Sequence, residues 1–245
     1  MSTELLVPLL IGLVVAFAAA QSVFGVGLLL FGTPTLLLLG LPFNAVLAYL
    51  LPCSIAVSAL QVADAGGLTL EPIRRQFLLF TCPAVVLATT AAVVFGTVHQ
   101  MRVAVGATLL LTAMSRVSRL RDSLARSVRR RLRPLLVALG LVHGLSNLGG
   151  GLLTVIVASR CADKAEIRRH IAFAYGAMAI LQLAVVLTTT RPPVNPGLWA
   201  ALPVCAAGCY LTVGRRIFRR AGEQPFQVGL TGMIAGYGVL LVATP

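Results

Sequence analysis

Apolar residues form long, nearly uninterrupted runs along this chain instead of alternating with polar ones. The runs divide the sequence into about eight apolar segments, and several reach the roughly 20 residues that a helix needs to cross a bilayer. This pattern predicts an all-α integral membrane protein. The composition, with 58% hydrophobic and 11% charged residues, indicates the same class and leaves no room for a soluble catalytic domain.

Basic residues lie between the apolar segments and set the expected topology. Of the 20 Lys and Arg, 18 fall in four short stretches, at 71–75, 116–133, 160–169 and 215–220. Positively charged flanks stay on the cytoplasmic side, so we expect all four stretches inside the cell, in a multi-pass protein of the plasma (inner) membrane. The net charge of +13 then reflects topology and contact with anionic headgroups of the lipid bilayer, and we expect no nucleic-acid partner.

One apolar run has both ends next to basic stretches that should lie inside. The run 134–158 stands alone between 116–133 and 160–169, so it cannot cross the membrane. The stretch HGLSNLGGG, residues 143–151, interrupts it in the middle. Splitting the run there gives two legs of about ten residues, each about 15 Å long, or half a bilayer. We predict a re-entrant helical hairpin whose Gly and Asn residues form the turn.

A similar interruption occurs earlier, at QSVFGVG, residues 21–27. Corresponding positions lie about 121 to 124 residues apart, which predicts two repeats, each a re-entrant hairpin plus three transmembrane helices. Three crossings per repeat make the repeats inverted, with both termini outside. The predicted organisation is a first repeat 1–115 (hairpin 5–40, spans 43–63, 76–98 and 100–115), an Arg-rich cytoplasmic linker 116–133, and a second repeat 134–245 (hairpin 134–158, spans 170–190, 197–213 and 225–243).

Inverted repeats with broken helices are typical of secondary transporters, whose substrate site lies where the breaks meet. Glycine N–H groups and helix N-termini at such breaks favour an anion. All seven acidic residues lie in or beside loops, so no carboxylate would repel it. We therefore expect a small anionic substrate. The candidate backbone donors are Gly25, Gly27, Gly149, Gly150 and Gly151, and the candidate side-chain donors are Gln21, Ser22, Ser146 and Asn147. The alternatives are close helix packing for the glycines and capping of the hairpin legs for the side chains.

The roles that we expect for other polar residues in the apolar runs are less specific. His143 is a candidate for proton coupling or anion sensing, against a neutral, hydrogen-bonded core histidine. Gln61 and Gln182 occupy matching positions in the two repeats and are expected to form interhelical bonds or to line the path. Tyr49 and Tyr175 line the path or pack. The five cysteines show no metal-binding spacing and no indication of a disulfide, so we expect no metal and no cofactor.

Two stretches resemble a known family. QSVFGVGLLLFGTPTLLLLGLP (21–42) and GLVHGLSNLGGGLLTV (140–155) are similar to the glycine-rich segments that each half of the TauE/SafE (sulfite exporter, DUF81) permeases carries. The resemblance implies a permease or exporter of sulfite, thiosulfate, a sulfonate or a related sulfur anion. The chain departs from the family at Gly25-Val-Gly27, where many members have a longer glycine run. A second departure is Leu-Pro-Cys-Ser (51–54) in place of a Thr-Ser-Leu type of sequence. These departures leave the substrate open.

Functions of other classes fit the sequence less well. An intramembrane enzyme would need a nucleophile with a base or a set of metal ligands, and neither Ser-x-x-Lys nor His-Glu-x-x-His occurs, so we expect no enzymatic activity. An ion channel lacks a ring of charged residues. The main alternative is a non-transporting membrane scaffold or accessory subunit, which would not need paired polar breaks. A homodimer is compatible with a small bundle, although no residue pattern specifies it.

Overall fold

The structure is a computed structural model that describes residues 3–24, 26–66, 72–115, 127–128, 130–161, 163–220, 239–240 and 243. All regular structure in these ranges is helical. The helices are α1 (Thr3–Phe24), α2 (Leu28–Leu38), α3 (Phe43–Asp64), α4 (Pro72–Phe95), α5 (Val98–Ser115), α7 (Leu132–Ser146), α8 (Gly150–Ala158), α9 (Lys164–Thr189), α10 (Pro196–Cys209), a π-helical turn η1 (Tyr210–Gly214) and α11 (Arg215–Arg220).

Four of the described helical stretches are long and apolar enough to cross a membrane: Phe43–Asp64, Arg74–Phe95, Ala165–Thr189 and Pro196–Ile217. Large apolar side chains point away from the protein, including Leu87 (70% exposed), Phe95 (79%) and Val204 (71%). Such exposure is unfavourable in water and favourable in lipid. The prediction of an all-α, multi-pass integral membrane protein is confirmed. The predicted span 225–243 lies outside the described residues except at 239, 240 and 243.

Local sequence explains where several helices begin. Asp163 precedes α9, and its side chain accepts a hydrogen bond from the Glu166 N–H at 2.9 Å. Asn195 caps α10 in the same way through the Leu198 N–H, at 3.1 Å, and Pro196 follows at the first helical position. Both are standard N-caps, which satisfy backbone donors that have no partner within the helix.

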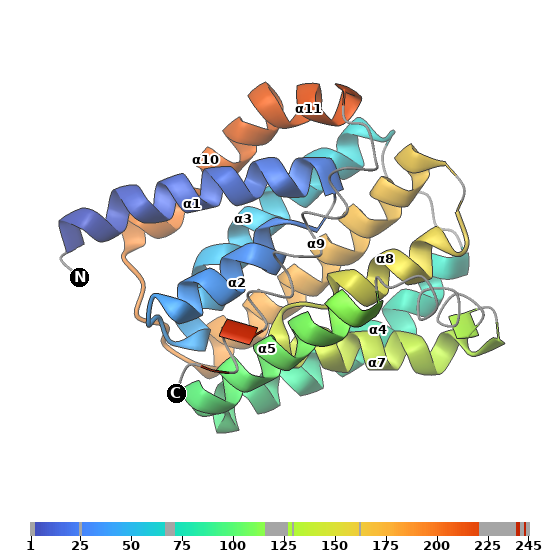
Figure 1. Ribbon diagram of the computed structural model, residues 1–245, viewed down its shortest axis with the longest axis horizontal. Coiled ribbons are helices and arrows are strands. Elements are labelled where there is room, and N and C mark those ends of the chain that lie inside the picture. The colour runs from blue at the N-terminus through green and yellow to red at the C-terminus, as the bar shows by residue number, and fades with distance from the viewer. Residues whose placement is uncertain are drawn as a thin grey trace.

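The chain breaks twice at the predicted places and folds back into two hairpins, α1–α2 and α7–α8 (Figure 1). The two legs of each hairpin are unequal, with 22 and 11 residues in the first and 15 and 9 in the second. Legs of about ten residues were expected for the second hairpin. Its first leg is longer because α7 begins at Leu132, where Pro134 is tolerated in the first turn.

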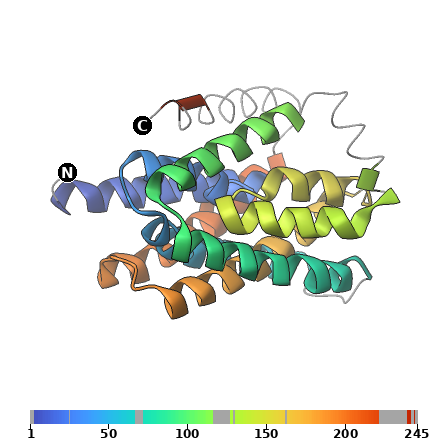
Figure 2. The same ribbon diagram turned by 90° about the horizontal axis from the view of Figure 1, so that it is seen from below.

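The packing crosses between the two halves of the sequence. Helices α3 and α9 pack against each other at the centre, α1 packs on α10, and α7 packs on α4. Figure 2 shows α7 between α8 and α4. Each hairpin therefore packs along a helix of the other half, and the helices after the two hairpins pair with one another. The inverted duplication that would relate the two halves stays a prediction.

The helix ends next to the basic stretches of the sequence gather at one end of the molecule. The end of α3, the beginnings of α4, α7 and α9, and α11 all lie toward the right of Figure 1. The hairpin α1–α2 enters from the opposite end, and α7–α8 enters from this one (Figure 1). Of the predicted Arg-rich linker 116–133, residues 116–126 and 129 lie outside the described residues.

Candidate functional site

The first hairpin turns at Val26 and Gly27, between the last turn of α1 and the first residue of α2. A Cβ at Gly27 would collide with the Gln21 backbone nitrogen and would lie 2.8 Å from the Ala20 Cβ. Only glycine therefore allows the chain to fold back so closely on α1. No side chain caps α2, whose N-cap is Gly27 itself. The candidate Gly25 lies outside the described residues.

The second hairpin turns through Asn147, Leu148 and Gly149. Asn147 adopts the left-handed conformation, with φ at 62°, and ends α7. Asn is one of the few residues besides glycine that enter this region at low cost. The Gly149 N–H donates to His143 Nδ1 at 3.0 Å, and a Cβ at Gly149 would lie 2.7 Å from the His143 Cβ. As in the first hairpin, the returning helix α8 has no side-chain cap.

The two turns meet in the interior of the protein. A Cβ at Gly150 would collide with the Tyr175 hydroxyl from α9 and would lie 3.1 Å from the Val26 Cβ of the first turn. Asn147 of the second turn donates through Nδ2 to Thr33 Oγ1 of α2, at 3.0 Å. We call this junction, formed by Val26, Gly27 and residues 147–151, the hairpin junction. It brings two uncapped helix N-termini together inside the protein.

Matching glutamines hold the two hairpins in place. Gln61 of α3 donates through Nε2 to the Gln21 carbonyl at 3.1 Å, and Gln182 of α9 donates to the His143 carbonyl at 3.3 Å. Gln61 and Gln182 were paired in the predicted repeat, and the residues that they contact, Gln21 and His143, each lie in the last turn of the first leg of a hairpin. The interhelical bonds expected for these amides are therefore present, and they have the same form in both halves.

His143 is fully buried and oriented by the turn that follows it. Its Nδ1 accepts the Gly149 N–H, so the proton of the neutral ring lies on Nε2. Its ring lies edge-on to Tyr175, with centroids 5.6 Å apart. His143 thus presents an Nε2–H donor on a ring that packs against the ring of Tyr175.

Seven buried side-chain atoms around the hairpin junction and the adjoining helices have no hydrogen-bond partner among the described residues. The donors are His143 Nε2 and the hydroxyls of Ser54 and Tyr175, and the acceptors are the side-chain oxygens of Gln21, Gln61, Asn147 and Gln182. A buried polar group without a partner costs about 1–3 kcal/mol. Such groups are rare in folded proteins, so a cluster of them indicates a site for a polar ligand or water.

A comparison with protein-family models decides the family. The model described as "Sulfite exporter TauE/SafE" matches residues 9–241. The chain belongs to this family. Neither a curated protein nor a solved structure matches the chain significantly. The family match confirms the resemblance drawn from the two glycine-rich stretches, and it makes the chain a member of a family of membrane transporters for sulfur anions.

For a TauE/SafE member, the expected site residues fall into two groups. Gln21, Gly27, His143, Asn147, Gly149, Gly150 and Gly151 form or contact the hairpin junction. Ser22 instead bonds to its own helix, at Ala18 O (2.7 Å). Ser146 donates to Val142 O of its own helix (2.6 Å) and also accepts the Leu148 N–H of the junction at 3.3 Å. Tyr49 lies elsewhere, because its hydroxyl accepts the Asn195 N–H at 2.8 Å, ahead of α10.

The sequence analysis did not identify four polar residues that either contact these groups or lie one helical turn from a residue that does. Thr33 accepts from Asn147, and Thr112 of α5 lies 2.5 Å from a Cβ built on Gly151. Ser58 lies 3.4 Å from Gln21 Nε2, and Ser54 precedes it by one turn on α3. Single Ser and Thr residues in apolar runs are common, and only the fold brings these four to the site. The one available signal was that Ser54 and Tyr175 occupy matching repeat positions, 121 residues apart.

A charged cluster closes the end of the bundle next to the first hairpin. Asp64, the last residue of α3, accepts hydrogen bonds from Arg215 and from the Tyr210 hydroxyl, the latter at 2.7 Å. Tyr210 begins the π-helical turn η1, and Gly214 at its end lies against Ser22 of α1. π-Helical turns often occur at functional sites. This cluster ties the end of α3 to η1 and α11, at the end where the basic segments gather.

Proposed function

We propose that this chain is a permease that carries a small sulfur oxyanion, such as sulfite, thiosulfate or a sulfonate, and binds it at the hairpin junction. The observation that carries the proposal is the set of unpartnered donors there, beside two uncapped helix N-termini. Buried donors of this kind are suited to an anion whose oxygens accept several hydrogen bonds at once.

The surroundings support an anion over a cation. The described acidic side chains belong to helix ends: Asp64 ends α3, Asp163 caps α9, and Glu166 lies in the first turn of α9. None of them contributes to the hairpin junction. The N-termini of α2 and α8 add positive potential from their helix dipoles without a counterion. His143 Nε2–H and the Tyr175 hydroxyl donate without carrying charge, so a neutral site with a positive field binds the anion and can still release it.

The junction is closed in this structure, because Gly150 lies directly against Tyr175 and Val26. Transport requires the two turns to separate, each moving with the glutamine that holds it. The hairpins enter from opposite ends of the protein, so separating one turn at a time would open the site to one side and then to the other. In this proposal, the helix ends beside the basic stretches face the inside of the cell, both termini lie outside, and the protein lies in the inner membrane.

His143 couples this movement to protons in our account. Protonation of Nδ1 would remove the acceptor of the Gly149 N–H and release the turn. A proton would thereby change both the charge of the site and the conformation of the hairpin. The Gly149 N–H bonds directly to the His143 ring, so a proton on the ring would act on the turn without an intervening residue.

The test is flux through proteoliposomes that contain the purified protein, with labelled sulfite, thiosulfate and a small sulfonate, with and without a pH gradient. We expect uptake of at least one anion, and its loss in Gly150→Leu, which fills the junction. The matched control is Gly12→Leu in α1, where an added Cβ meets nothing within 4 Å. No uptake of any anion by folded protein would contradict the proposal and favour the scaffold or accessory subunit.

A further inference from the structure

Three side chains with different metal-binding groups meet where α8 connects to α9. Cys161 lies in the connection, and Glu166 and His170 lie in the first turns of α9. The Cys161 sulfur, a Glu166 carboxylate oxygen and a His170 ring nitrogen all lie within 4.8 Å of one another. We propose that these three residues bind a zinc ion. The site is separate from the hairpin junction, and the proposal does not depend on what the protein transports.

The local fold preorganises the three groups. Glu166 and His170 are four positions apart and share a helix face, with Glu166 Oε1 3.7 Å from His170 Nε2. The Asp163 cap fixes the first turn of α9 and so places the Cys161 segment beside that face. Zinc bonds of about 2.0–2.3 Å require ligand atoms about 3.3–3.6 Å apart, so the cluster must contract by only about 1 Å.

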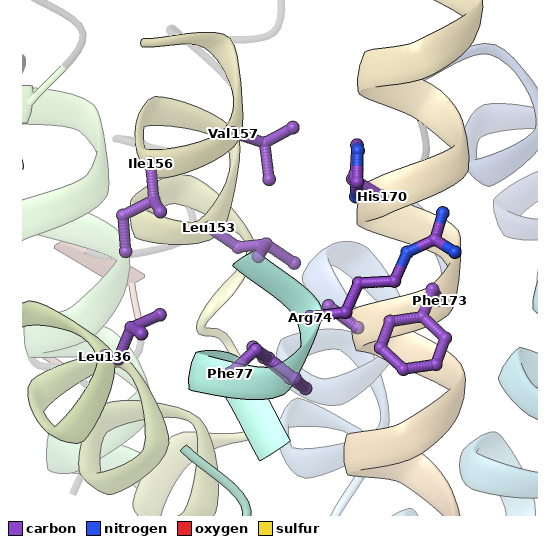
Figure 3. Close-up of a pocket in the computed structure, with 9 residues that line it drawn as sticks. Arg74, Phe77, Leu136, Leu153, Ile156, Val157, His170 and Phe173 are labelled. Carbon is purple, nitrogen blue, oxygen red and sulfur yellow. The ribbon is translucent and has the colours of Figure 1, made fainter. Parts of the chain in front are cut away.

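The different exposure of the His170 and Glu166 side chains makes that contraction feasible. The His170 side chain is 3% exposed and is held in place, whereas the Glu166 side chain is 37% exposed and can change rotamer. His170 also lines a small pocket between α4, α7, α8 and α9, and Figure 3 shows it beside Arg74 and above Phe173. The buried histidine on the helix, the carboxylate that can change rotamer and the thiol in the connecting loop together form a typical three-ligand zinc site with one open position.

The ligand types select the metal. One sulfur, one nitrogen and one oxygen donor suit Zn²⁺, whereas Mg²⁺ and Ca²⁺ prefer oxygen ligands alone. Thiolate and carboxylate together would neutralise the ion. Three basic residues lie nearby in the sequence: Arg160, Arg168 and Arg169. Their positive charge disfavours binding of a hard cation that is held mainly by charge. It is less unfavourable for an ion that is bound through sulfur and nitrogen.

A bound zinc ion would fasten the connection that follows α8 to α9. Helix α8 is the returning leg of the second hairpin, and it has only nine residues. Fixing its far end would limit how far the hairpin can move relative to α9. The spacing Cys-x4-Glu-x3-His differs from the common zinc motifs, which explains why the sequence did not indicate a site.

The experiment is a zinc titration of the full-length protein, purified in detergent and stripped of metal, against a chromophoric chelator. We expect one Zn²⁺ per chain, weakened at least about tenfold in Cys161→Ser and in His170→Ala. Cys82→Ser is the matched control, because Cys82 of α4 is also a partly buried cysteine but lies outside the cluster. It should bind zinc as the unmodified protein does, and Mg²⁺ should not compete.

Cobalt provides a second measurement on the unmodified protein. Co²⁺ bound by a thiolate gives a charge-transfer absorption in the near ultraviolet, and we expect this band to appear on titration and to be absent from Cys161→Ser. Absence of stoichiometric zinc binding, of the cobalt band, or of any effect of Cys161→Ser on affinity would each overturn the proposal.

Discussion

The contact between Gly150 and Tyr175 gives the sharpest prediction about the hairpin junction. In Gly150→Ala, the new methyl group would collide with the Tyr175 hydroxyl and would lie 3.1 Å from the ring carbon that bears it and from the Val26 Cβ. Overpacking of this kind costs about 1–3 kcal/mol. At about 1.36 kcal/mol for each factor of ten, the closed junction should be disfavoured about 5- to 150-fold, and transport should fall accordingly.

Tyr175→Phe separates this steric effect from a general loss of stability. Alone, it removes one donor and should reduce transport about 2- to 10-fold, as expected for a net hydrogen bond of about 0.5–1.5 kcal/mol. In the double variant, the worst collision disappears and the closest contacts become 3.1 Å. The double variant should therefore transport better than the product of the single effects predicts, with a coupling energy of about 0.5–3 kcal/mol.

The assay is initial-rate flux in proteoliposomes for the four members of this cycle, with thermal unfolding in detergent measured on the same preparations. Gly12→Ala is the matched control, because a Cβ there meets nothing within 4 Å, and its flux should be unchanged. The reasoning is refuted if Gly150→Ala transports at the unmodified rate, or if the effects of Gly150→Ala and Tyr175→Phe simply multiply.

Two further predictions concern the groups that hold the turns. Gln61→Leu and Gln182→Leu should each lower the free energy of unfolding by about 0.5–1.5 kcal/mol, because each removes one buried hydrogen bond from an amide to a carbonyl, while the His143 carbonyl keeps the Asn147 N–H. Thermal denaturation should show a decrease of about 1–6 °C, against a small change in Gln76→Leu on α4, and equal melting temperatures in all three would exclude this role. Asn147→Gly and Asn147→Ala both lose the hydrogen bond to Thr33. The left-handed backbone at this position is strained for Ala but not for Gly, so Asn147→Ala should be about 1–2 kcal/mol less stable than Asn147→Gly. Equal stability of the two variants would show that the turn relaxes to another conformation.

Much of the helical framework could be predicted from the lengths of the apolar runs and from the placement of charge. The two breaks, near Gly27 and Asn147, were identifiable because glycines and polar residues interrupt apolar runs that would otherwise continue. The correspondence of Gln61 with Gln182 was also visible, and the structure gives both residues the same hydrogen-bonding task. The duplication that this correspondence suggests stays a prediction.

The details of the site depend on contacts between distant parts of the chain. The partners Asn147 and Thr33 are 114 positions apart, and nothing local in either segment indicates the bond. The orientation of His143 also follows from the turn geometry, since its acceptor role depends on where the Gly149 N–H points. The unequal leg lengths could not be predicted either, because apolar sequence sets where a helix can form but not where packing ends it.

The central claim is that the transported anion binds between the two turns. Selenite, the selenium analogue of sulfite, provides a direct measurement, because its position can be located by anomalous scattering in crystals of the protein soaked or grown with it. The account predicts a peak at the hairpin junction, within hydrogen-bonding distance of the first N–H groups of α8 and of His143 Nε2. A selenite peak elsewhere in the protein, with none at the junction, would contradict it.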